Sequence, residues 1–329
     1  MAIVSPLRHV LRRLSTAATA AASTTSSLPI DLPTVRSLAK SGRYSEITAL
    51  LKPPARTVTT VNSILSALNR SKSPSLVPSL FSSLFPSLSL IPDHVSYGIL
   101  IKSHCLLRRA SSHALPLLHD LRSKNLHINP VILTTILDSL YKEGKPDLAE
   151  KIWQEMKSKA ALDLPAYNVR IMHYALAGRP KDVLSLIEEM EAAGLKPDII
   201  TFNYLMTCYC NNGRFEDAKK VYRELGARGC EPNAATFNNF VHLLCKNGDF
   251  PTAAEVSMDG MKRNKAPDFG TTKILVEGLV RGSKVRAAKR VVSKVRNKFP
   301  AKFDGGWKEL GRGIGLKVGD GTAKLAAAA

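Results

Sequence analysis

Apolar residues in the middle of the chain recur at the spacing of one face of an α-helix. One stripe, at positions i, i+3, i+4 and i+7, consists of Phe202, Leu205, Met206 and Tyr209. A second stripe follows at Ala218, Val221, Tyr222 and Leu225. Between them the polar stretch NNGR (211–214) breaks the pattern, and Gly213 suits the left-handed end of a helix. Because Pro232 then stops the second helix from continuing, the pattern predicts two helices joined by a short turn.

Three markers repeat this hairpin every 35 residues. They are the asparagines Asn168, Asn203 and Asn238, the glycines Gly178, Gly213 and Gly248, and the prolines Pro197, Pro232 and Pro267. The clearest units cover 130–163, 164–198, 199–233 and 234–268, and fainter copies extend the array over 30–303, about seven to eight repeats. One hairpin cannot bury both of its stripes, but stacked hairpins can. We therefore expect an all-α fold, a right-handed α-solenoid superhelix of helix-turn-helix repeats.

The two ends of the chain differ from this array. Residues 1–29 contain Arg8, Arg12 and Arg13 and many Ser, Thr and Ala, and no acidic residue precedes Asp31. This composition is typical of an organellar transit peptide, and its amphipathic, arginine-bearing start favours the mitochondrion over the chloroplast. Residues 304–329 are glycine-rich and are expected to form a flexible C-terminal tail.

The net charge of the chain indicates what class of partner it binds. The chain has 47 Lys and Arg against 27 Asp and Glu, a formal charge of +20, which indicates an anionic partner such as nucleic acid, an anionic membrane or a ribosome. No apolar stretch is long enough to span a membrane, and no membrane partner is expected. The excess rises toward the C-terminus, where we predict a phosphate-binding patch or, alternatively, a merely solvated helix face. The patch consists of Arg281, Lys284, Arg286, Lys289 and Arg290.

Residues typical of enzymes and metal sites do not gather in the sequence. The five cysteines are Cys105, Cys208, Cys210, Cys230 and Cys245, with no C-x-x-C spacing, and we expect them to be small buried side chains in a reducing compartment. The H-x-E and C-x-x-C pair of a zinc deaminase is missing, and the C-terminal acidic residues are scattered. The sequence therefore predicts a protein that is not an enzyme and needs no cofactor.

Several short segments carry a family resemblance. The tokens AYN and TFN, the stretch NNGRFEDAKKVYREL and the closing KPD, EPN and APD resemble pentatricopeptide repeats of the plain type found in plant organellar proteins. Tetratricopeptide repeats, with a period of about 34 residues, are the rival, but their Trp/Leu/Gly/Tyr pattern is missing from the first helix of each unit. A peptide-binding scaffold of that kind is therefore only a remote alternative.

The resemblance implies single-stranded RNA as the ligand, with one base read per repeat. The reading residues would be the fifth residue of each first helix and the last residue of the unit. The implied pairs are Asn168 with Asp198, Asn203 with Asn233, Asn238 with Asp268, Thr134 with Asp163 and Asn62 with Asp93. In the family's code these pairs imply the word U, unknown, G, U, pyrimidine, U. Gly98 with Asn129 and Lys273 with Phe303 match no usual pair.

Each of these residues also has a purely structural interpretation. The asparagines would then only tolerate a helix start, and the aspartates would be turn or capping residues after a proline. Thr201 and Thr236 are expected as N-caps of their helices. Val95 and Ile200, at second positions, would be apolar wedges between bases or ordinary packing residues.

The leading hypothesis for the function is a mitochondrial RNA-binding protein that acts in organellar RNA metabolism or translation by covering a single-stranded segment. The alternative is a structural component of the small subunit of the mitochondrial ribosome, holding ribosomal RNA and ribosomal proteins. The incomplete code and the basic C-terminal stretch motivate that alternative.

Overall fold

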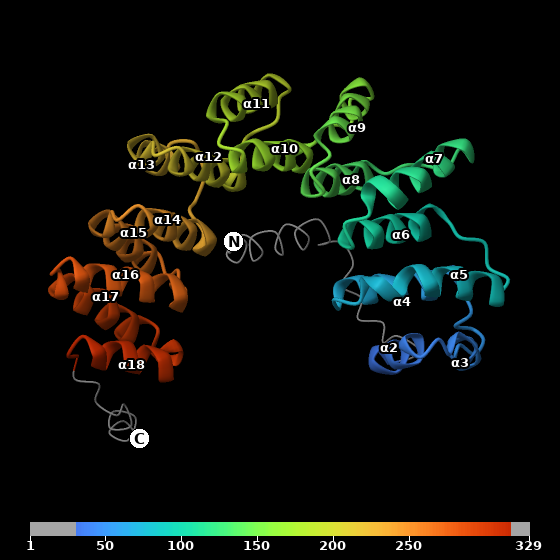
Figure 1. The fold of residues 1–329 in the computed structure, drawn as a ribbon, viewed down its shortest axis with the longest axis horizontal. Coiled ribbons are helices and arrows are strands. Elements are labelled where there is room, and N and C mark those ends of the chain that lie inside the picture. Colours follow the sequence, from blue (N-terminus) through green and yellow to red (C-terminus); the bar gives the residue numbers. More distant parts are fainter. Residues whose placement is uncertain (1–30, 317–329) are drawn as a thin grey trace. The chain divides into compact units, whose positions relative to one another are not determined.

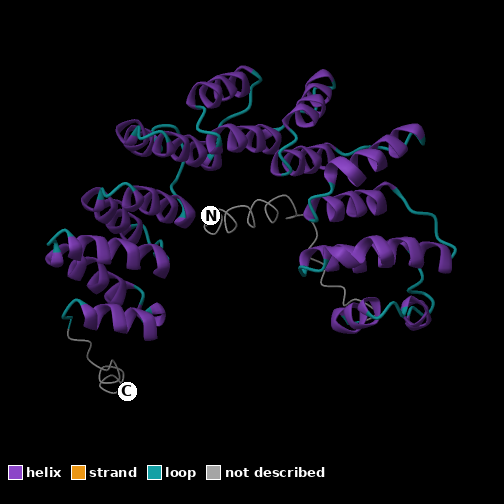
Figure 2. Cartoon of the chain, in the orientation of Figure 1, coloured by secondary structure: helices purple, strands orange, loops and turns teal. Residues whose placement is uncertain are grey.

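The computed structural model describes residues 31–316, and within them every regular element is a helix (Figures 1 and 2). The helices follow one another as hairpins, which confirms the expected all-α fold of helix-turn-helix repeats. The hairpins are α2 (Leu32–Lys40) with α3 (Tyr44–Leu50), α4 (Val58–Arg70) with α5 (Val77–Ser87), α6 (His94–Leu106) with α7 (Leu115–Ser123), α8 (Pro130–Lys142) with α9 (Pro146–Ser158), α10 (Leu164–Leu176) with α11 (Pro180–Ala192), α12 (Ile199–Asn211) with α13 (Phe215–Glu224), α14 (Ala234–Lys246) with α15 (Phe250–Lys262), and α16 (Phe269–Arg281) with α17 (Val285–Lys298).

Contacts divide the described residues into an N-terminal unit, 31–170, and a C-terminal unit, 171–316, with the boundary inside α10. In the N-terminal unit α4 packs on α6 and α6 on α8, while α3 packs on α5. In the C-terminal unit α12 packs on α14 and α14 on α16, while α15 packs on α17. Within each unit the first helices thus form one layer and the second helices form another.

The turn between the two helices of a hairpin follows the predicted glycine chemistry. Gly213 has φ +71°, and the next N–H, of Arg214, donates to the carbonyl of Tyr209 at 2.9 Å. Ser283 stands at the same place between α16 and α17 with φ +59°, a left-handed conformation that is costly for a residue with a Cβ. The last hairpin therefore keeps the turn but lacks the glycine.

The predicted apolar stripes form the core between the helices. All four members of the first stripe, on α12, are buried. On α13 Ala218 and Val221 are buried and Tyr222 is half-buried, and Leu225, directly after the helix, is buried as well. The C-terminal unit also has aromatic rings seated against glycines. A Cβ at Gly278 would lie 1.9 Å from the ring of Phe250, and one at Gly260 would lie 2.7 Å from the ring of Phe237. No larger residue fits these two positions unless the helices shift.

The expectation of a flexible tail over residues 304–329 is wrong for the first part of that segment. Residues Gly305–Gly313 form a further helix, α18, after a short 3-10 turn at Pro300–Lys302. Trp307 of α18 is 5% exposed, and its ring meets that of Phe269 at the start of α16 at 5.1 Å between centroids. Burial of this indole against α16 outweighs the low helix propensity of the four glycines in the segment. Residues 317–329 lie outside the described residues, as does the predicted transit peptide.

The expected burial of the five cysteines is confirmed. All five thiols are free and buried, and burial raises the pKa of Cys105, Cys210 and Cys245 to about 12. Within residues 31–316 no helix is both long and apolar enough to cross a membrane, and no group of three or more His, Cys, Asp or Glu is placed to hold a metal ion.

Candidate RNA interface

The predicted last residue of each unit is the N-cap of the next first helix. The Asp198 Oδ1 accepts from the backbone N–H groups of Ile200 and Thr201, both at 3.0 Å. The Thr201 hydroxyl donates to the same oxygen at 3.0 Å and accepts from the Asp198 N–H at 3.2 Å. Thr201 is therefore the third helical residue of a capping box, and the expectation that it is the N-cap is wrong.

The same arrangement recurs in the neighbouring repeat. Asn233 Oδ1 accepts from the N–H of Thr236 at 3.0 Å, so Asn233 caps α14 and Thr236 stands at the third helical position. The expected N-cap role of Thr236 is wrong for the same reason. The short side chain of Asp or Asn, which directly follows a proline in both repeats, is better placed than the threonine hydroxyl to accept from the free N–H groups. The predicted reading residues Asp93, Asp163 and Asp268 cap α6, α10 and α16 in the same way.

This register corrects the last pair. The residue that precedes α18 is Asp304, one position beyond the predicted Phe303, because the 3-10 turn lengthens the unit by one residue. Phe303 is buried at 8% exposure and packs inside the unit. Asp304 is exposed and occupies the N-cap position, so it is Asp304 that corresponds to Asp268 of the preceding repeat.

The predicted first members stand five residues after each cap, on the first-helix layer. Asn62, Asn168 and Asn203 are 8%, 4% and 9% exposed, while Asn238 and Thr134 are half-buried. A base edge that reached any of these side chains would therefore meet an amide or hydroxyl held firmly between neighbouring helices. Such holding is what discrimination by hydrogen bonds requires, because a fixed donor or acceptor rejects the wrong pattern.

The structure brings two of the predicted pairs into direct contact. The Asn62 Nδ2 donates to the Asp93 carboxylate at 3.2 Å, and the Asp268 N–H donates to Asn238 Oδ1 at 3.1 Å. Partial burial by itself would raise the pKa of Asp93, but the hydrogen bonds from Ser96 and Asn62 outweigh it and lower that pKa. Asp93 therefore carries a charge at neutral pH.

The other predicted pairs are arranged differently. No hydrogen bond joins Asn203 to Asn233 within the described residues, and the buried Asn203 Oδ1 has no partner there. The Thr134 hydroxyl donates to the Pro130 carbonyl of its own helix at 3.2 Å. Asn168 belongs to the N-terminal unit and Asp198 to the C-terminal unit.

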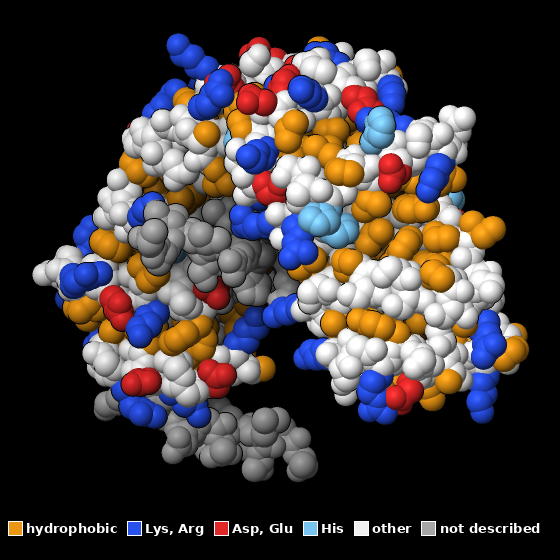
Figure 3. Space-filling model, turned by 45° about the vertical axis from the view of Figure 1, so that its right-hand side comes forward, with side chains coloured by type: hydrophobic (Ala, Val, Ile, Leu, Met, Phe, Trp, Pro, Cys, Tyr) orange, Lys and Arg blue, Asp and Glu red, His pale blue; other side chains and the backbone are white. Residues whose placement is uncertain are grey.

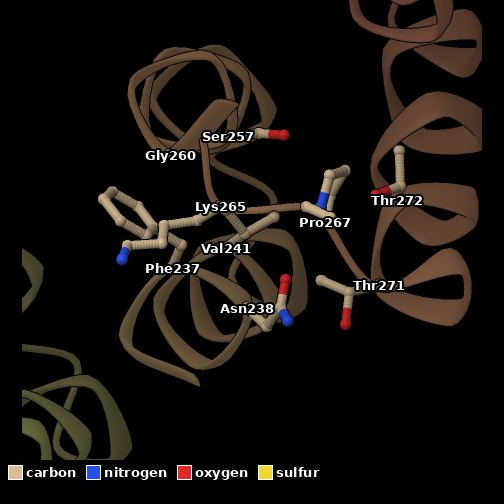
Figure 4. A pocket seen from close by; sticks show the side chains of 10 residues that line it. Phe237, Asn238, Val241, Ser257, Gly260, Lys265, Pro267, Thr271 and Thr272 are labelled. Carbon is tan, nitrogen blue, oxygen red and sulfur yellow. The ribbon is translucent and has the colours of Figure 1, made fainter. Parts of the chain in front are cut away.

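A pocket lies beside the contact between Asn238 and Asp268. Figure 4 shows the Asn238 amide directed into it, near Pro267 and Thr271. Lys265 also lines the pocket, but its amino group lies on the Phe237 side, away from the Asn238 amide (Figure 4). Sequence reasoning missed Lys265, although a basic residue just before the closing Ala-Pro-Asp is a usable signal.

Apolar side chains are exposed at the second helical positions of the N-terminal unit. Val95 is 46% and Val131 53% exposed, whereas Ile200 is half-buried. The space-filling view shows apolar side chains at the surface of this unit (Figure 3). Val131 was missed in the sequence, although its place two residues after the cap Asn129 identifies it.

The predicted phosphate patch lies mostly on the layer of second helices. Arg281 ends α16, Lys284 is the N-cap of α17, and Arg286, Lys289 and Arg290 are on α17 itself. Lys289 is half-exposed and the other four are exposed. The patch and the predicted reading residues thus belong mainly to different layers of the C-terminal unit.

The fold and the repeat register define a helical-repeat protein with hairpins of about 35 residues. In a typical repeat a capping residue precedes the first helix, and an asparagine stands five residues after that cap. The family model described as "PPR repeat family" matches residues 197–246, and the model described as "PPR repeat" matches 131–159 and 165–195. The chain belongs to the pentatricopeptide repeat family.

Two curated relatives from Arabidopsis thaliana match the chain over most of its length. The small ribosomal subunit protein mL103 (rPPR7) of Arabidopsis thaliana is 41% identical over 263 residues, covering 79% of this chain and 63% of the relative. A mitochondrial pentatricopeptide repeat-containing protein of Arabidopsis thaliana is 34% identical, covering 79% of this chain and 62% of that protein. The chain thus spans less than two thirds of the length of either relative.

The crystal structure of pentatricopeptide repeat protein PPR10 from maize matches 95% of this chain and 46% of that chain, with a TM-score of 0.55 and 20% identity. The structure of PPR10 with an 18-nucleotide psaJ RNA element matches 92% of this chain and 49% of that chain, with a TM-score of 0.53 and 19% identity. At these identities the likeness supports the fold.

Proposed function

We propose that this chain is a non-enzymatic protein that binds single-stranded RNA along its layer of first helices and reads bases with the amide and cap residues of successive repeats. The observation that carries the proposal is the contact between Asn238 and the N-cap Asp268 at 3.1 Å, beside a pocket that the amide enters. The pocket is too small to hold a base, so the base edge would lie over its mouth, where the Asn238 amide and the neighbouring Asp268 offer the donor and acceptor pattern that discrimination needs.

Asn203 supports the proposal in a second way. Its buried Oδ1 has no hydrogen-bond partner within the described residues, and an unpaired buried acceptor costs about 1–3 kcal/mol. A pyrimidine could satisfy that oxygen with the ring N–H of uracil or the exocyclic amine of cytosine. Because that oxygen is enclosed by protein, the base would bind it only after the Asn203 side chain turned toward the surface, and the gained hydrogen bond would offset part of the cost of that change.

The test is a double substitution, Asn203→Ala with Asn238→Ala, measured on short single-stranded RNAs. We expect binding of an RNA that contains the implied word to weaken by about thirtyfold, because two hydrogen bonds are lost at roughly 1 kcal/mol each, with little change for a scrambled RNA. A matched control replaces Asn211 and Asn247, which are exposed at the far ends of the first helices α12 and α14. Equal losses on both RNAs would refute base reading.

We place the protein in mitochondria, within organellar RNA metabolism or translation. The basis is the mitochondrial name of one relative and the small-ribosomal-subunit name of the other. The second name also favours a second candidate, a structural component of the small mitochondrial ribosomal subunit that contacts ribosomal RNA and ribosomal proteins. Sedimentation of organelle lysate with a tagged copy separates the two. Co-migration with the small subunit supports the ribosomal role, whereas a light particle that collapses with RNase supports a free RNA-binding protein.

A further inference from the structure

The stretch 281–302 is unusually basic for its length. It contains nine Lys or Arg residues and no Asp or Glu. Most of it is α17, the second helix of the last hairpin, and the first turn of α17 has no acidic residue. Such a stretch has a strongly positive surface unless neighbouring elements neutralise it.

The register of the repeats shows what changed in α17. Counted from the N-caps Asp198 and Asp268, Arg286 stands where α13 has Glu216, and Ala287 stands where α13 has Asp217. By the same count Lys294 stands where α13 has Glu224. The α17 surface thus has basic or neutral residues at the places that are acidic on α13.

The acidic residues of the other second helices neutralise nearby cations. Arg179 bonds to Asp182 at 2.9 Å on α11. On α13, Arg214 bonds to Asp217 at 2.6 Å. None of Lys284, Arg286 and Arg290 forms an ion pair within residues 31–316. Cations at a helix N-terminus also oppose the helix dipole, so this arrangement costs stability and is explained by binding rather than by folding.

The location of these cations separates them from the proposed reading surface. α17 packs on α15 in the layer of second helices, whereas Asn203 and Asn238 are on α12 and α14 in the layer of first helices. The core side of α17 is occupied by Ala288, Val291, Val292 and Val295, all at most 1% exposed. Its outer side is left to Arg286, Arg290 and Lys294, spaced i, i+4 and i+8 along one face.

We propose that α17 is a second RNA-binding surface that holds the phosphate backbone of a folded, double-helical RNA segment. Duplex RNA is recognised mainly through its shape, its phosphates and its 2′-hydroxyls, and it does not need amides that reach splayed bases. A row of cations along the outer side of α17, with Arg286 and Arg290 exposed and Lys294 half-buried, fits that ligand. The surface has few apolar groups, with Val285 at 37% exposure as its main one, so it lacks the apolar anchors of a protein interface.

The test compares two triple substitutions with the same loss of three charges. The α17 variant is R286Q/R290Q/K294Q. The control is K181Q/K220Q/R223Q, which removes exposed cations from the second helices α11 and α13 of the same unit. Each full-length protein is titrated with a blunt RNA duplex and with a single-stranded RNA over a range of salt concentrations.

We expect the α17 variant to bind the duplex about tenfold more weakly than the control variant, with a salt slope shallower by about two to three, since each phosphate contact contributes roughly 0.9. Duplex binding that equals that of the control would overturn the proposal. The α17 variant could instead keep its duplex binding and lose only its binding to a polyglutamate peptide. That result would assign the surface to an acidic protein and would also overturn the proposal. Circular dichroism and the melting temperature of both variants show whether each remains folded.

The Asn203→Ala with Asn238→Ala protein provides the separate readout for the first-helix layer. We expect it to bind the duplex as the unmodified protein does. The two surfaces therefore fail independently: loss of word preference concerns the amides, and loss of duplex binding concerns α17.

Discussion

Helices α13 and α17 hold the same place in two repeats of the C-terminal unit, yet they are stabilised by different means. On α13, Lys219 bonds to Glu216 at 2.9 Å and to Asp249 of the next hairpin at 2.7 Å. At the same register α17 has Lys289, which forms no ion pair within the described residues. α17 depends instead on its buried valine face, and its hairpin partner α16 is held to α15 by packing as well, because Phe250 of α15 fills the space above Gly278 of α16. Where apolar packing stabilises a repeat, its surface charges are not needed for ion pairs between helices, so they are available to bind a ligand.

The strongest way to break this comparison is Gly278→Ala. The new methyl group would overlap the Phe250 ring, with 1.9 Å between the Cβ and the nearest ring carbon, so α15 and α16 must separate. We expect a loss of about 3 kcal/mol or more in the free energy of unfolding, measured by urea denaturation. Gly305→Ala at the start of α18, where a Cβ meets open space, is the control. A loss below about 1 kcal/mol would show that packing at Gly278 does not hold the last repeats.

Lys219→Met and Lys289→Met test the ion-pair side of the comparison directly. Lys219 is 17% exposed, and its removal leaves the partly buried Asp249 without its cation. We expect Lys219→Met to cost about 1–2 kcal/mol and Lys289→Met to stay within about 0.5 kcal/mol of the unmodified protein. Equal effects of the two substitutions, measured by chemical denaturation, would remove the distinction between the helices.

The turns before the two helices provide a third test. Ser283→Gly relieves a left-handed serine with φ +59° and should stabilise the protein by about 0.5–1 kcal/mol. The reverse change at the matched position, Gly213→Ser, should destabilise it by a similar amount, since Gly213 has φ +71°. Thermal melting of both variants checks the opposite signs.

Arg286→Glu restores the acidic residue that α13 has at this register. The carboxylate would lie in the first turn of α17 and four residues before Arg290, so we expect a gain of about 0.3–0.5 kcal/mol in stability. The same protein should bind duplex RNA more weakly. A variant that is less stable than the unmodified protein would contradict the idea that the α17 charges are there for binding.

The smallest of these effects concerns acid. A fall in pH should weaken the ion pair between Lys219 of α13 and Asp249, whereas Lys289 of α17 has no such ion pair to lose within the described part of the chain. Burial alone would raise the pKa of Asp249, but hydrogen bonds from Lys219 and Thr252 outweigh it and lower the pKa. A depressed pKa contributes stability that is present above the unfolded value, about 3.9, and is lost as the pH falls through the folded value. Asp249→Asn should therefore flatten the acid limb of the stability curve below about pH 4. An unchanged limb would contradict this assignment.

Much of the fold could be predicted because it is written in local periodicity. The stripes of α12 and α13, the turn at Gly213 and the 35-residue period each depend on residues a few positions apart, and all are found in the structure. The positions of the proposed reading residues followed from the same register. Their capping role was predicted only as the structural alternative, beside the expectation that Thr201 caps α12, because which of the two residues caps depends on which oxygen lies closest to the free N–H groups.

The sequence by itself determined an all-helical array of hairpins and its family, because helix period and turn chemistry act between near neighbours along the chain. Only the tertiary structure decided that α18 forms, that Asp304 rather than Phe303 precedes it, and which cations have partners. The physical reason is distance along the chain. Lys219 and Asp249, Phe250 and Gly278, and Phe269 and Trp307 are each separated by roughly one repeat, and they meet only when one hairpin packs on the next.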